Sequence, residues 1–494
     1  MRLIKIVPVI AAALSMTASA AWDKVCVVQV ADVSAFANAT AKLGEITGNQ
    51  MLSAMTAGFF MEPPGSKFFG PMRPGASAAL PIYIDSAAMA KDKEFDFDDD
   101  ALGFALLYPM TISRAEFIKL HPGAVETNGL VRVKGSIDFD KDDDDDDDGS
   151  FTYVAFTADG KWACASPDLA QASRSIADVK LAERPLRGNL ARVYGEPGGV
   201  AILRKLAASL AEEAKKKKER FDGRICDALA GIDSFSAGIK VGDAGIDLDI
   251  CAKTVAGTEM AKVGLVSLPA DPLAFAGPDA ISASSDAGLR NVDPAEAWNA
   301  IVSILKRHGL DVSSFITLAS TPAAAHLKFD VKALVKYATG PATNALAKID
   351  VDKLTEEVKN CKVFDIPLKA ADKPQNTAFS VAGYKPKFTA AQRFAATFPE
   401  AKGRPLFGAG VISLSAFLQA VVPAIMAELP EKDRAGIQPF LAFMPQEAGA
   451  GIGVMQWRDK DRCHFVLRIS SGELKGIGTA VTAAMAASMT KDEE

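Results

Sequence analysis

The sequence predicts an α+β fold in which antiparallel sheets, built from hairpins and a meander, carry helices packed on one face. Three observations support this class. Short β-branched runs such as "KVCVVQV" (24–30) alternate with turn residues. Most connections between these runs are too short for the crossover helix that a parallel pair needs. Helices that begin with good N-cap residues follow several of the strands.

The first twenty residues have the pattern of a signal peptide. Arg2 and Lys5 supply positive charge, an apolar run follows, and Ala18 to Ala20 match the small-residue pattern of a cleavage site. No cysteine lies at that point, and no later segment has about 18 uninterrupted apolar residues. We therefore expect export to the periplasm or the extracellular medium after cleavage near Ala20, with no transmembrane anchor. A buried N-terminal strand is the competing interpretation.

The chain has 494 residues, which is long enough for more than one hydrophobic core. Apolar residues make up 49% of it and charged residues 23%, the balance of an ordinary globular protein. After the signal peptide (1–20) we predict four parts: an N-terminal α+β lobe with acidic hairpin tips (21–195), a connecting amphipathic helix (196–225), a middle α+β lobe (226–375) and a C-terminal α+β lobe (376–494).

In the N-terminal lobe we expect a meander of three strands over 129–139, 151–156 and 161–166. An Asp-Gly turn joins the last two strands, and an acidic run lies at the first turn. A helix should follow, with Ser166 as its N-cap and Pro167 at its first position.

The connecting helix has apolar residues at helical spacing and a basic block (215–218) near its C-terminal end, where cations suit the helix dipole. The apolar residues are Ile202, Leu203, Leu206 and Leu210. In the middle lobe the strongest helix pattern covers 292–309. There Asp293 is the expected N-cap, Pro294 is the first helical residue, and Glu296 has capping-box spacing.

The C-terminal lobe should contain a hairpin over 451–469 and two helices whose first residues have capping-box spacing. These pairs are Thr389 with Gln392 and Ser470 with Glu473. A strand, a polar cap and a short helix also follow one another at 27–36, 324–334 and 408–417. Internal duplication and chance similarity are both open interpretations, and no short period indicates a solenoid.

Negative charge is concentrated in two places. The formal net charge is −6, and the windows 91–100 and 138–148 hold 15 of the 61 acidic residues but only 3 of the 55 basic ones. The remainder of the chain has no basic excess of the size that nucleic-acid binding needs. We therefore expect no nucleic-acid partner.

The longest acidic run is seven aspartates at 142–148. The run ends in the D-x-D-x-D-G pattern that opens an EF-hand loop, but the twelfth loop position is Ala155 and strands flank the loop where helices are required. This excludes an EF-hand. A solvated hairpin tip is the main interpretation. The competing one is a weak divalent-cation site, with Ca²⁺ as its ion, formed by Asp142, Asp144, Asp146 and Asp148.

Six cysteines are an even number in a chain with an export signal, which makes all of them disulfide candidates of unknown pairing. None of them is spaced C-x-x-C, so neither a zinc ribbon nor a thioredoxin-type pair is indicated. Buried thiols are the alternative, because several cysteines lie in apolar runs. The candidates are Cys26, Cys164, Cys226, Cys251, Cys361 and Cys463.

Catalytic motifs are missing from the sequence. It contains no G-x-S-x-G, H-E-x-x-H or G-x-x-x-x-G-K-[ST] pattern. The histidines fall in a turn, at a helix C-terminus and in two strand-like runs, where structural roles are more common. The glycine-rich stretch at 449–453 opens a hairpin and not a helix, which favours close backbone packing over nucleotide binding. The histidines are His121, His308, His326 and His464.

A Pro/Gly-rich loop at 59–72 carries four phenylalanines: Phe59, Phe60, Phe68 and Phe69. Such a loop can meet an apolar ligand or a protein partner, or it can pack over a sheet edge. Taken together, the sequence favours an exported, non-enzymatic protein that binds a partner or serves in the cell envelope, without a cofactor. The alternatives are a hydrolase-type enzyme with a carboxylate site that no motif marks, and a calcium-binding surface protein that uses the aspartate loop.

Overall fold

The structure is a computed structural model, and it describes residues 22–48, 66–85, 102–127, 129–135, 151–217, 222–290, 292–321, 324–339, 350–364, 366–434, 441 and 444–479. The chain forms two compact units. Unit 1 comprises 1–41, 53–221 and 232–240, and unit 2 comprises 42–52, 222–231 and 241–494. The predicted signal peptide and all seven aspartates of 142–148 lie outside the described residues.

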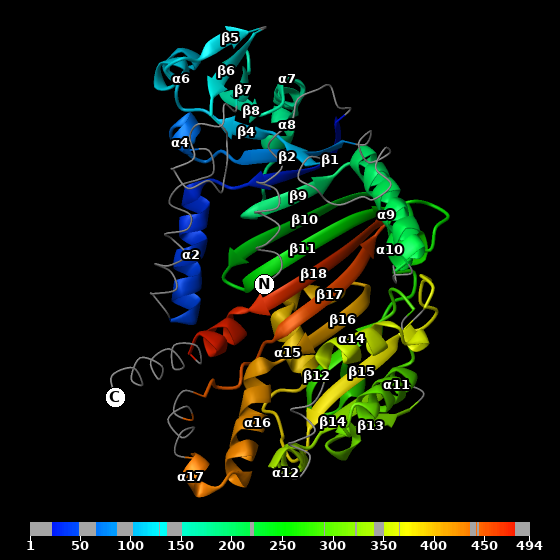
Figure 1. The fold of residues 1–494 in the computed structure, drawn as a ribbon. Coiled ribbons are helices and arrows are strands. Elements are labelled where there is room, and N and C mark those ends of the chain that lie inside the picture. The colour runs from blue at the N-terminus through cyan, green and yellow to red at the C-terminus, as the bar shows by residue number, and fades with distance from the viewer. Residues whose placement is uncertain are drawn as a thin grey trace. The chain divides into compact units, whose positions relative to one another are not determined.

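Unit 1 is built on antiparallel strands, as predicted (Figure 1). The central strand β1 (Trp22–Val30) pairs with β2 on one side and with β9 on the other. The order of paired strands is β10 (Ile232–Gly242), β9 (Ala191–Gly195), β1, β2 (Ala78–Asp85), β3 (Leu102–Phe104) with β4 (Leu106–Pro109), β8 (Trp162–Ser166), β7 (Phe151–Phe156), β6 (Leu130–Lys134) and β5 (Val125–Thr127).

The predicted meander is confirmed in β6, β7 and β8. Val131 lies opposite Val154, and Ala155 lies opposite Cys164, in antiparallel register. The helix that follows, α7 (Leu169–Ser175), starts two residues later than expected because β8 extends through Ser166. Asp168 is its N-cap in place of Ser166.

Alternate residues of β4 and β8 enter two different cores of unit 1. One core contains Leu107 and Cys164 and is covered by α8 (Val179–Ala182). The other contains Leu106 and Tyr108 and is covered by α4 (Ser66–Phe69) and α6 (Arg114–Leu120). Because side chains alternate along a strand, these cores lie on opposite faces of the sheet.

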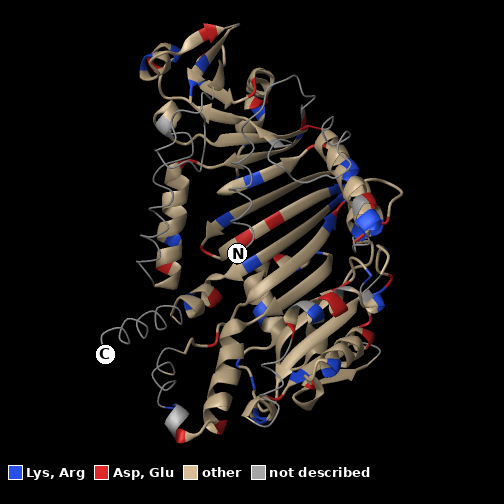
Figure 2. Cartoon of the chain, in the orientation of Figure 1, with Lys and Arg blue, Asp and Glu red and all other residues tan. Residues whose placement is uncertain are grey.

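The predicted amphipathic helix is α9 (Pro197–Lys217), which packs against β1. Lys215, Lys216 and Lys217 of its basic block occupy the last turn, where Figure 2 shows Lys and Arg gathered at one end of the helix. The predicted apolar residues of α9 contact Val25 and Ile84 on the neighbouring strands. The backbones approach so closely that a Cβ added to Gly199 would lie 1.8 Å from the carbonyl oxygen of Val25.

Unit 2 has one mixed sheet in which, among the strand pairs that the structure describes, only β14 and β15 are parallel to each other. The order is β11 (Gly245–Thr254), β18 (Arg462–Ser470), β17 (Ile452–Asp459), β16 (Leu406–Ile412), β12 (Ala280–Asp286), β15 (Gln375–Val381), β14 (Ala325–Phe329) and β13 (Ile316–Ser320). The predicted hairpin at 451–469 is β17 and β18. The expected boundary between the middle and C-terminal lobes falls inside β15.

Helices cover the sheet of unit 2 at two cores. In the first, α15 (Ala390–Thr397) packs Phe394 and the following Phe398 onto strand residues such as Met455. In the second, α12 (Val331–Thr339) and α16 (Leu414–Glu428) pack around Ile281. Three further helices of unit 2 are α10 (Arg224–Ala230), α11 (Pro294–Arg307) and α14 (Val351–Lys359).

The three strand–cap–helix segments share their local geometry. Each strand, β1, β14 or β16, leads directly into a helix, α2 (Val33–Thr47), α12 or α16. The cap residues are Asp32, Asp330 and Ser413. Each cap side chain accepts a hydrogen bond from the backbone N–H of the residue three positions later. N-capping alone accounts for this likeness, so it does not establish duplication.

In the part of the chain that the structure describes, no helix combines the length and the apolar character that crossing a membrane would need. The glycine-rich stretch at 449–453 packs closely, as predicted. A Cβ on Gly453 would lie 2.6 Å from the ring of Phe398, and one on Gly451 would lie 2.6 Å from the carbonyl oxygen of Ile412.

Gly199→Ala should destabilise the protein by roughly 1–3 kcal/mol, because the added methyl group forces α9 away from β1. Chemical denaturation would measure this loss. Gly198→Ala is the matched control, because a Cβ on Gly198 would meet nothing within 4 Å in the same helix turn. An equal response of the two variants would show that α9 does not pack against β1 in this way.

Candidate functional site

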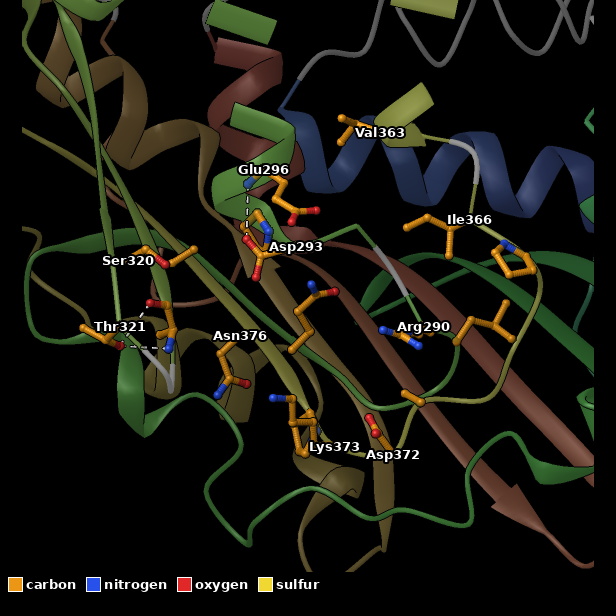
Figure 3. A pocket seen from close by; sticks show the side chains of 18 residues that line it. Arg290, Asp293, Glu296, Ser320, Thr321, Val363, Ile366, Asp372, Lys373 and Asn376 are labelled. Atoms are coloured by element: carbon orange, nitrogen blue, oxygen red, sulfur yellow. Dashed lines mark hydrogen bonds between the residues drawn. The ribbon is translucent and has the colours of Figure 1, made fainter. Parts of the chain in front are cut away.

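A pocket of unit 2, which we call pocket A, has a volume of about 640 Å³. Its walls come from four segments: the loop before α11 with the first turn of that helix, the turn between β13 and β14, the loop at 363–367, and the loop that leads into β15 (Figure 3). Volumes of about 300–1,000 Å³ are typical of small-molecule sites.

Hydrogen bonds hold the walls of pocket A in place. The backbone N–H of Arg290 donates to the carbonyl of Lys369 at 2.8 Å, and the N–H of Ala371 donates to the carbonyl of Gly288 at 3.1 Å. The Gln375 side chain donates to the carbonyl of Val292 at 2.6 Å. Two loops about 80 residues apart along the chain are therefore joined beside the pocket.

The predicted helix start is also part of this wall. Asp293 caps α11 and accepts hydrogen bonds from the N–H groups of Ala295 and Glu296 at 2.8 and 3.2 Å. Pro294 occupies the first turn, as expected. The carboxylate of Asp293 is thus used by the helix, whereas the Glu296 side chain is exposed at the pocket.

Charged groups of both signs line pocket A. Arg290 and Lys373 are exposed cations, and Glu296 and Asp372 are exposed anions. Among the described residues, none of these four side chains has an ion-pair partner within 4.0 Å. In Figure 3, Arg290 and Ile366 lie across the pocket from Ser320 and Thr321. The half-buried Val363 and Ile366 add an apolar part to the wall.

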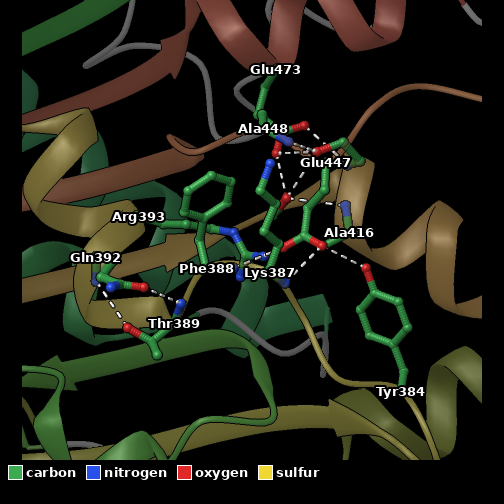
Figure 4. Close-up of polar contacts among 12 residues, drawn as sticks. Tyr384, Lys387, Phe388, Thr389, Gln392, Arg393, Ala416, Glu447, Ala448 and Glu473 are labelled. Atoms are coloured by element: carbon green, nitrogen blue, oxygen red, sulfur yellow. Dashed lines mark hydrogen bonds and ion pairs between the residues drawn. The ribbon is translucent and has the colours of Figure 1, made fainter.

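A second polar site of unit 2 is buried and surrounds Glu447 (Figure 4). Its carboxylate accepts hydrogen bonds from the Tyr384 hydroxyl at 2.8 Å and from the N–H groups of Lys387 and Phe388 at 2.9 and 3.2 Å. It also forms an ion pair with Arg393, whose side chain is completely buried. Burial favours the neutral acid, but these donors outweigh it and hold the pKa of Glu447 below its ordinary value.

Glu473 joins this site from the C-terminal helix. The N–H of Glu473 donates to Ser470 at 3.3 Å, as the capping spacing predicts. Its carboxylate, however, accepts hydrogen bonds from the hydroxyls of Ser413 and Ser415 at 2.6 and 3.1 Å. Ser415 in turn accepts from the N–H of Ala448, next to Glu447, at 2.9 Å. Both carboxylates of this site are satisfied from within the fold, which is typical of a structural role.

The predicted metal site cannot be compared with the structure, because Asp142, Asp144, Asp146 and Asp148 lie outside the described residues. Within the described ranges no group of three or more His, Cys, Asp or Glu side chains is arranged to hold a metal ion. Of the apolar loop, Phe59 and Phe60 are likewise not described. Phe69 is fully buried in a core of unit 1, beside Tyr108 and Phe117.

No disulfide joins the six cysteines, all of which are described, so the predicted cross-links are absent. Cys251 lies opposite His464, while Cys463 lies opposite Ala252, so these two thiols point to opposite faces of the sheet. Cys26 is on β1 and Cys164 is on β8, with β2 and β4 between them. Three strand spacings separate β1 from β8 by roughly 14 Å, which exceeds the reach of a disulfide.

The histidines occupy the local settings that were predicted for them. His121 caps α6 and contacts the carbonyl oxygen of Phe68 at 2.8 Å, and His308 is the C-cap of α11. His464 stacks on Trp457 with ring centroids 4.7 Å apart. The guanidinium of Arg404 also lies over the Trp457 ring. Burial lowers the pKa of His464, which favours the neutral imidazole.

Comparisons with known proteins give no relative: no family model, curated protein or solved structure matches the chain. Function has therefore to be inferred from the residues and geometry of the sites. Sequence reasoning did not find pocket A, since its walls come from distant segments and its charged residues have no motif.

Glu447→Gln should lower the free energy of unfolding by roughly 3–5 kcal/mol, because it leaves the buried Arg393 charge without its partner. Glu431→Gln, an exposed position on α17 (Glu431–Arg434), is the control and should change it by less than about 0.5 kcal/mol. Denaturation at several pH values gives a further check. Because the pKa of Glu447 is lowered in the folded state, its contribution is present above about pH 4.5 and is lost as the pH falls further. The variant should lack that loss.

Alkylation of unfolded protein without reductant should modify all six cysteines. In the folded protein Cys164 should react most slowly, because it is fully buried and burial raises the pKa of its thiol. Burial also raises the pKa of Cys26, to about 11. Intact-mass spectrometry counts the modified sites, and a mass two hydrogens lower with fewer than six modified sites would contradict the structure.

Proposed function

We propose that this chain is an exported, non-catalytic binding protein whose pocket A takes a short zwitterionic ligand of the dipeptide class. The observation that carries the proposal is the presence of two cations and two anions, unpaired within the described protein, on the wall of one pocket. The signal-peptide pattern that ends near Ala20 supports export.

The charges suit the two ends of such a ligand. Arg290 and Lys373 can bind a carboxylate, for which a guanidinium offers parallel N–H donors. Glu296 and Asp372 can accept hydrogen bonds from an ammonium group. The half-buried Val363 and Ile366 would contact an apolar side chain of the ligand. A dipeptide fills a volume of about 640 Å³ better than a single amino acid does.

The chemistry of the lining favours binding over catalysis. Among the described residues that line pocket A, none is a histidine or a cysteine. The Thr321 hydroxyl is bonded to the carbonyl of Ala324 within its own turn, at 3.1 Å, and Asp293 is bonded to the start of α11. Covalent catalysis requires a nucleophile next to a base, and these two lining residues do not form such a pair.

Calorimetric titration of the full chain with alanyl-leucine, with its C-terminal amide and with its N-acetyl derivative tests this proposal. We expect the dipeptide to bind and each derivative to bind about tenfold more weakly, because each loses one charge-assisted contact. Lys373→Gln should weaken binding of the dipeptide about tenfold and leave binding of the amide nearly unchanged.

Lys369→Gln is the matched control, since Lys369 is exposed on the same loop but does not line pocket A. Equal affinities for the three compounds, or no heat of binding for any of them, would contradict the proposal. Release of free leucine during the titration, measured by mass spectrometry, would favour the hydrolase alternative instead.

A further inference from the structure

The loop at 366–374 supplies two of the charged side chains of pocket A, Asp372 and Lys373 (Figure 3). It leads from the 3₁₀ turn η6 (Lys362–Phe364) into β15. The described residues of this loop form no helix or strand, and both charged side chains are exposed. Regular structure therefore does not determine where Asp372 and Lys373 lie, and particular contacts of the loop have to do so.

One side of the loop pairs with the segment that carries Arg290. Leu289 and Ala370 form an isolated antiparallel bridge, whose two hydrogen bonds are donated by the N–H groups of Arg290 and Ala371. In an antiparallel pair, a residue whose neighbours make these bonds directs its own N–H to the opposite side. The N–H of Ala370 therefore points away from Leu289 and needs another acceptor.

Glu259 supplies that acceptor from 111 residues away along the chain. Its Oε2 accepts a hydrogen bond from the N–H of Ala370 at 2.9 Å, and its Oε1 accepts one from Lys262 Nζ at 2.6 Å. Because the two donors use different oxygens, they fix the orientation of the carboxylate. They also hold the pKa of Glu259 below its ordinary value, with Lys262 as the larger cause, so the carboxylate is charged at neutral pH.

The segment that carries Glu259 is itself attached to the sheet of unit 2. Glu259 directly precedes the 3₁₀ turn η3 (Met260–Lys262). After this turn, the carbonyl of Val263 accepts a hydrogen bond from the guanidinium of Arg458 on β17 at 2.6 Å. The loop at 366–374 is thus held from two sides, by its bridge to the neighbouring loop and by a turn that β17 anchors.

We propose that Glu259 is a positioning residue of pocket A, which holds the loop at 366–374 where Asp372 and Lys373 line the pocket. This role rests on the proposed function, because it concerns binding of the dipeptide at the same site. Glu259 does not line pocket A, so it acts through the loop and not by contact with the ligand. A loop that is already held in its bound arrangement does not have to be ordered when the ligand binds, which preserves affinity.

Two substitutions of Glu259 separate its hydrogen bond from its charge. Glu259→Ala removes the acceptor of the Ala370 N–H and should weaken binding of alanyl-leucine about tenfold in calorimetric titration of the full chain. Glu259→Gln keeps a side-chain oxygen that can accept from this N–H, and its affinity should stay within about twofold of the wild type. Asp271→Ala removes an exposed carboxylate of unit 2 that does not line pocket A. It is the matched control and should leave the affinity unchanged.

Native-state hydrogen exchange without ligand gives a readout that a general loss of stability would not produce. The amides of Arg290 and Ala371 donate to backbone carbonyls and not to Glu259, so their exchange reports how the loop is held. In Glu259→Ala they should exchange roughly fivefold faster or more, and Glu259→Gln should restore the slower exchange. The amides of β17 and β18 should be unchanged in both variants. Equal acceleration in these strands would show that Glu259 stabilises unit 2 as a whole, and would overturn the proposal.

The two proposals for pocket A can fail separately. No binding of alanyl-leucine by the wild type would overturn the proposed function, and exchange at Arg290 and Ala371 would then decide alone whether Glu259 holds the loop. Binding by the wild type with equal affinity in Glu259→Ala would overturn the role of Glu259 and leave the proposed function intact. Unchanged exchange at both amides in Glu259→Ala would do the same.

Discussion

Unit 2 depends on two carboxylates, the half-buried Glu447 and the fully buried Glu473, which are satisfied by donors from distant parts of the chain. Glu447 binds the segment at 384–388 and the helix α15, and Glu473 binds the first residues of α16. A buried carboxylate that loses its donors costs several kcal/mol. The segments around these two side chains can therefore take only the arrangement that supplies every donor.

This arrangement has a consequence for the buried Arg393. Glu447 satisfies its Nη2, but Nε and Nη1 have no hydrogen-bond partner among the described residues. A buried ion pair contributes little net stability when part of it remains unsatisfied, and its main effect is then to select one packing over others. We infer that the Glu447 site fixes where α15 lies on the sheet, and that Phe394 and Phe398 supply the packing energy.

A second buried ion pair connects the strands beneath α15. Arg468 on β18 donates to Asp247 on β11 at 2.6 and 2.9 Å, at positions that lie opposite each other in the sheet. The same guanidinium donates to the carbonyl of Thr397, the last residue of α15, at 2.8 Å. Two polar contacts thus hold α15: the ion pair between Arg393 and Glu447, and the hydrogen bond from Arg468 to Thr397. Both need the strand register that the structure has.

The sequence predicted those features that depend on neighbouring residues, namely helix caps and the apolar face of a helix. Asp293, Thr389 and Gln392 cap helices where expected, and the apolar residues of α9 pack as their spacing indicates. The carboxylate of Glu473 was assigned to a local capping box because its partners, Ser413 and Ser415, are about 60 residues away. The cap expected at Ser166 is found at Asp168, because nothing local in the sequence shows that β8 extends through Ser166.

Pocket A could not be predicted for the same reason. Arg290 and Lys373 resemble the other basic residues in the sequence, and only the pairing of two distant loops brings them to one pocket. The even number of cysteines and the expected export predicted disulfides. The structure has none, and the order of the strands keeps Cys26 and Cys164 apart.

Native-state hydrogen exchange tests the central role of the two carboxylates most directly. The amides of Lys387, Phe388 and Ser415 donate to Glu447 or Glu473 and not to another backbone group. They should exchange only when unit 2 unfolds globally, as slowly as the amides of β16 to β18. Exchange as fast as that of the exposed turn at Lys402 and Gly403 would show that the carboxylates do not hold these segments together.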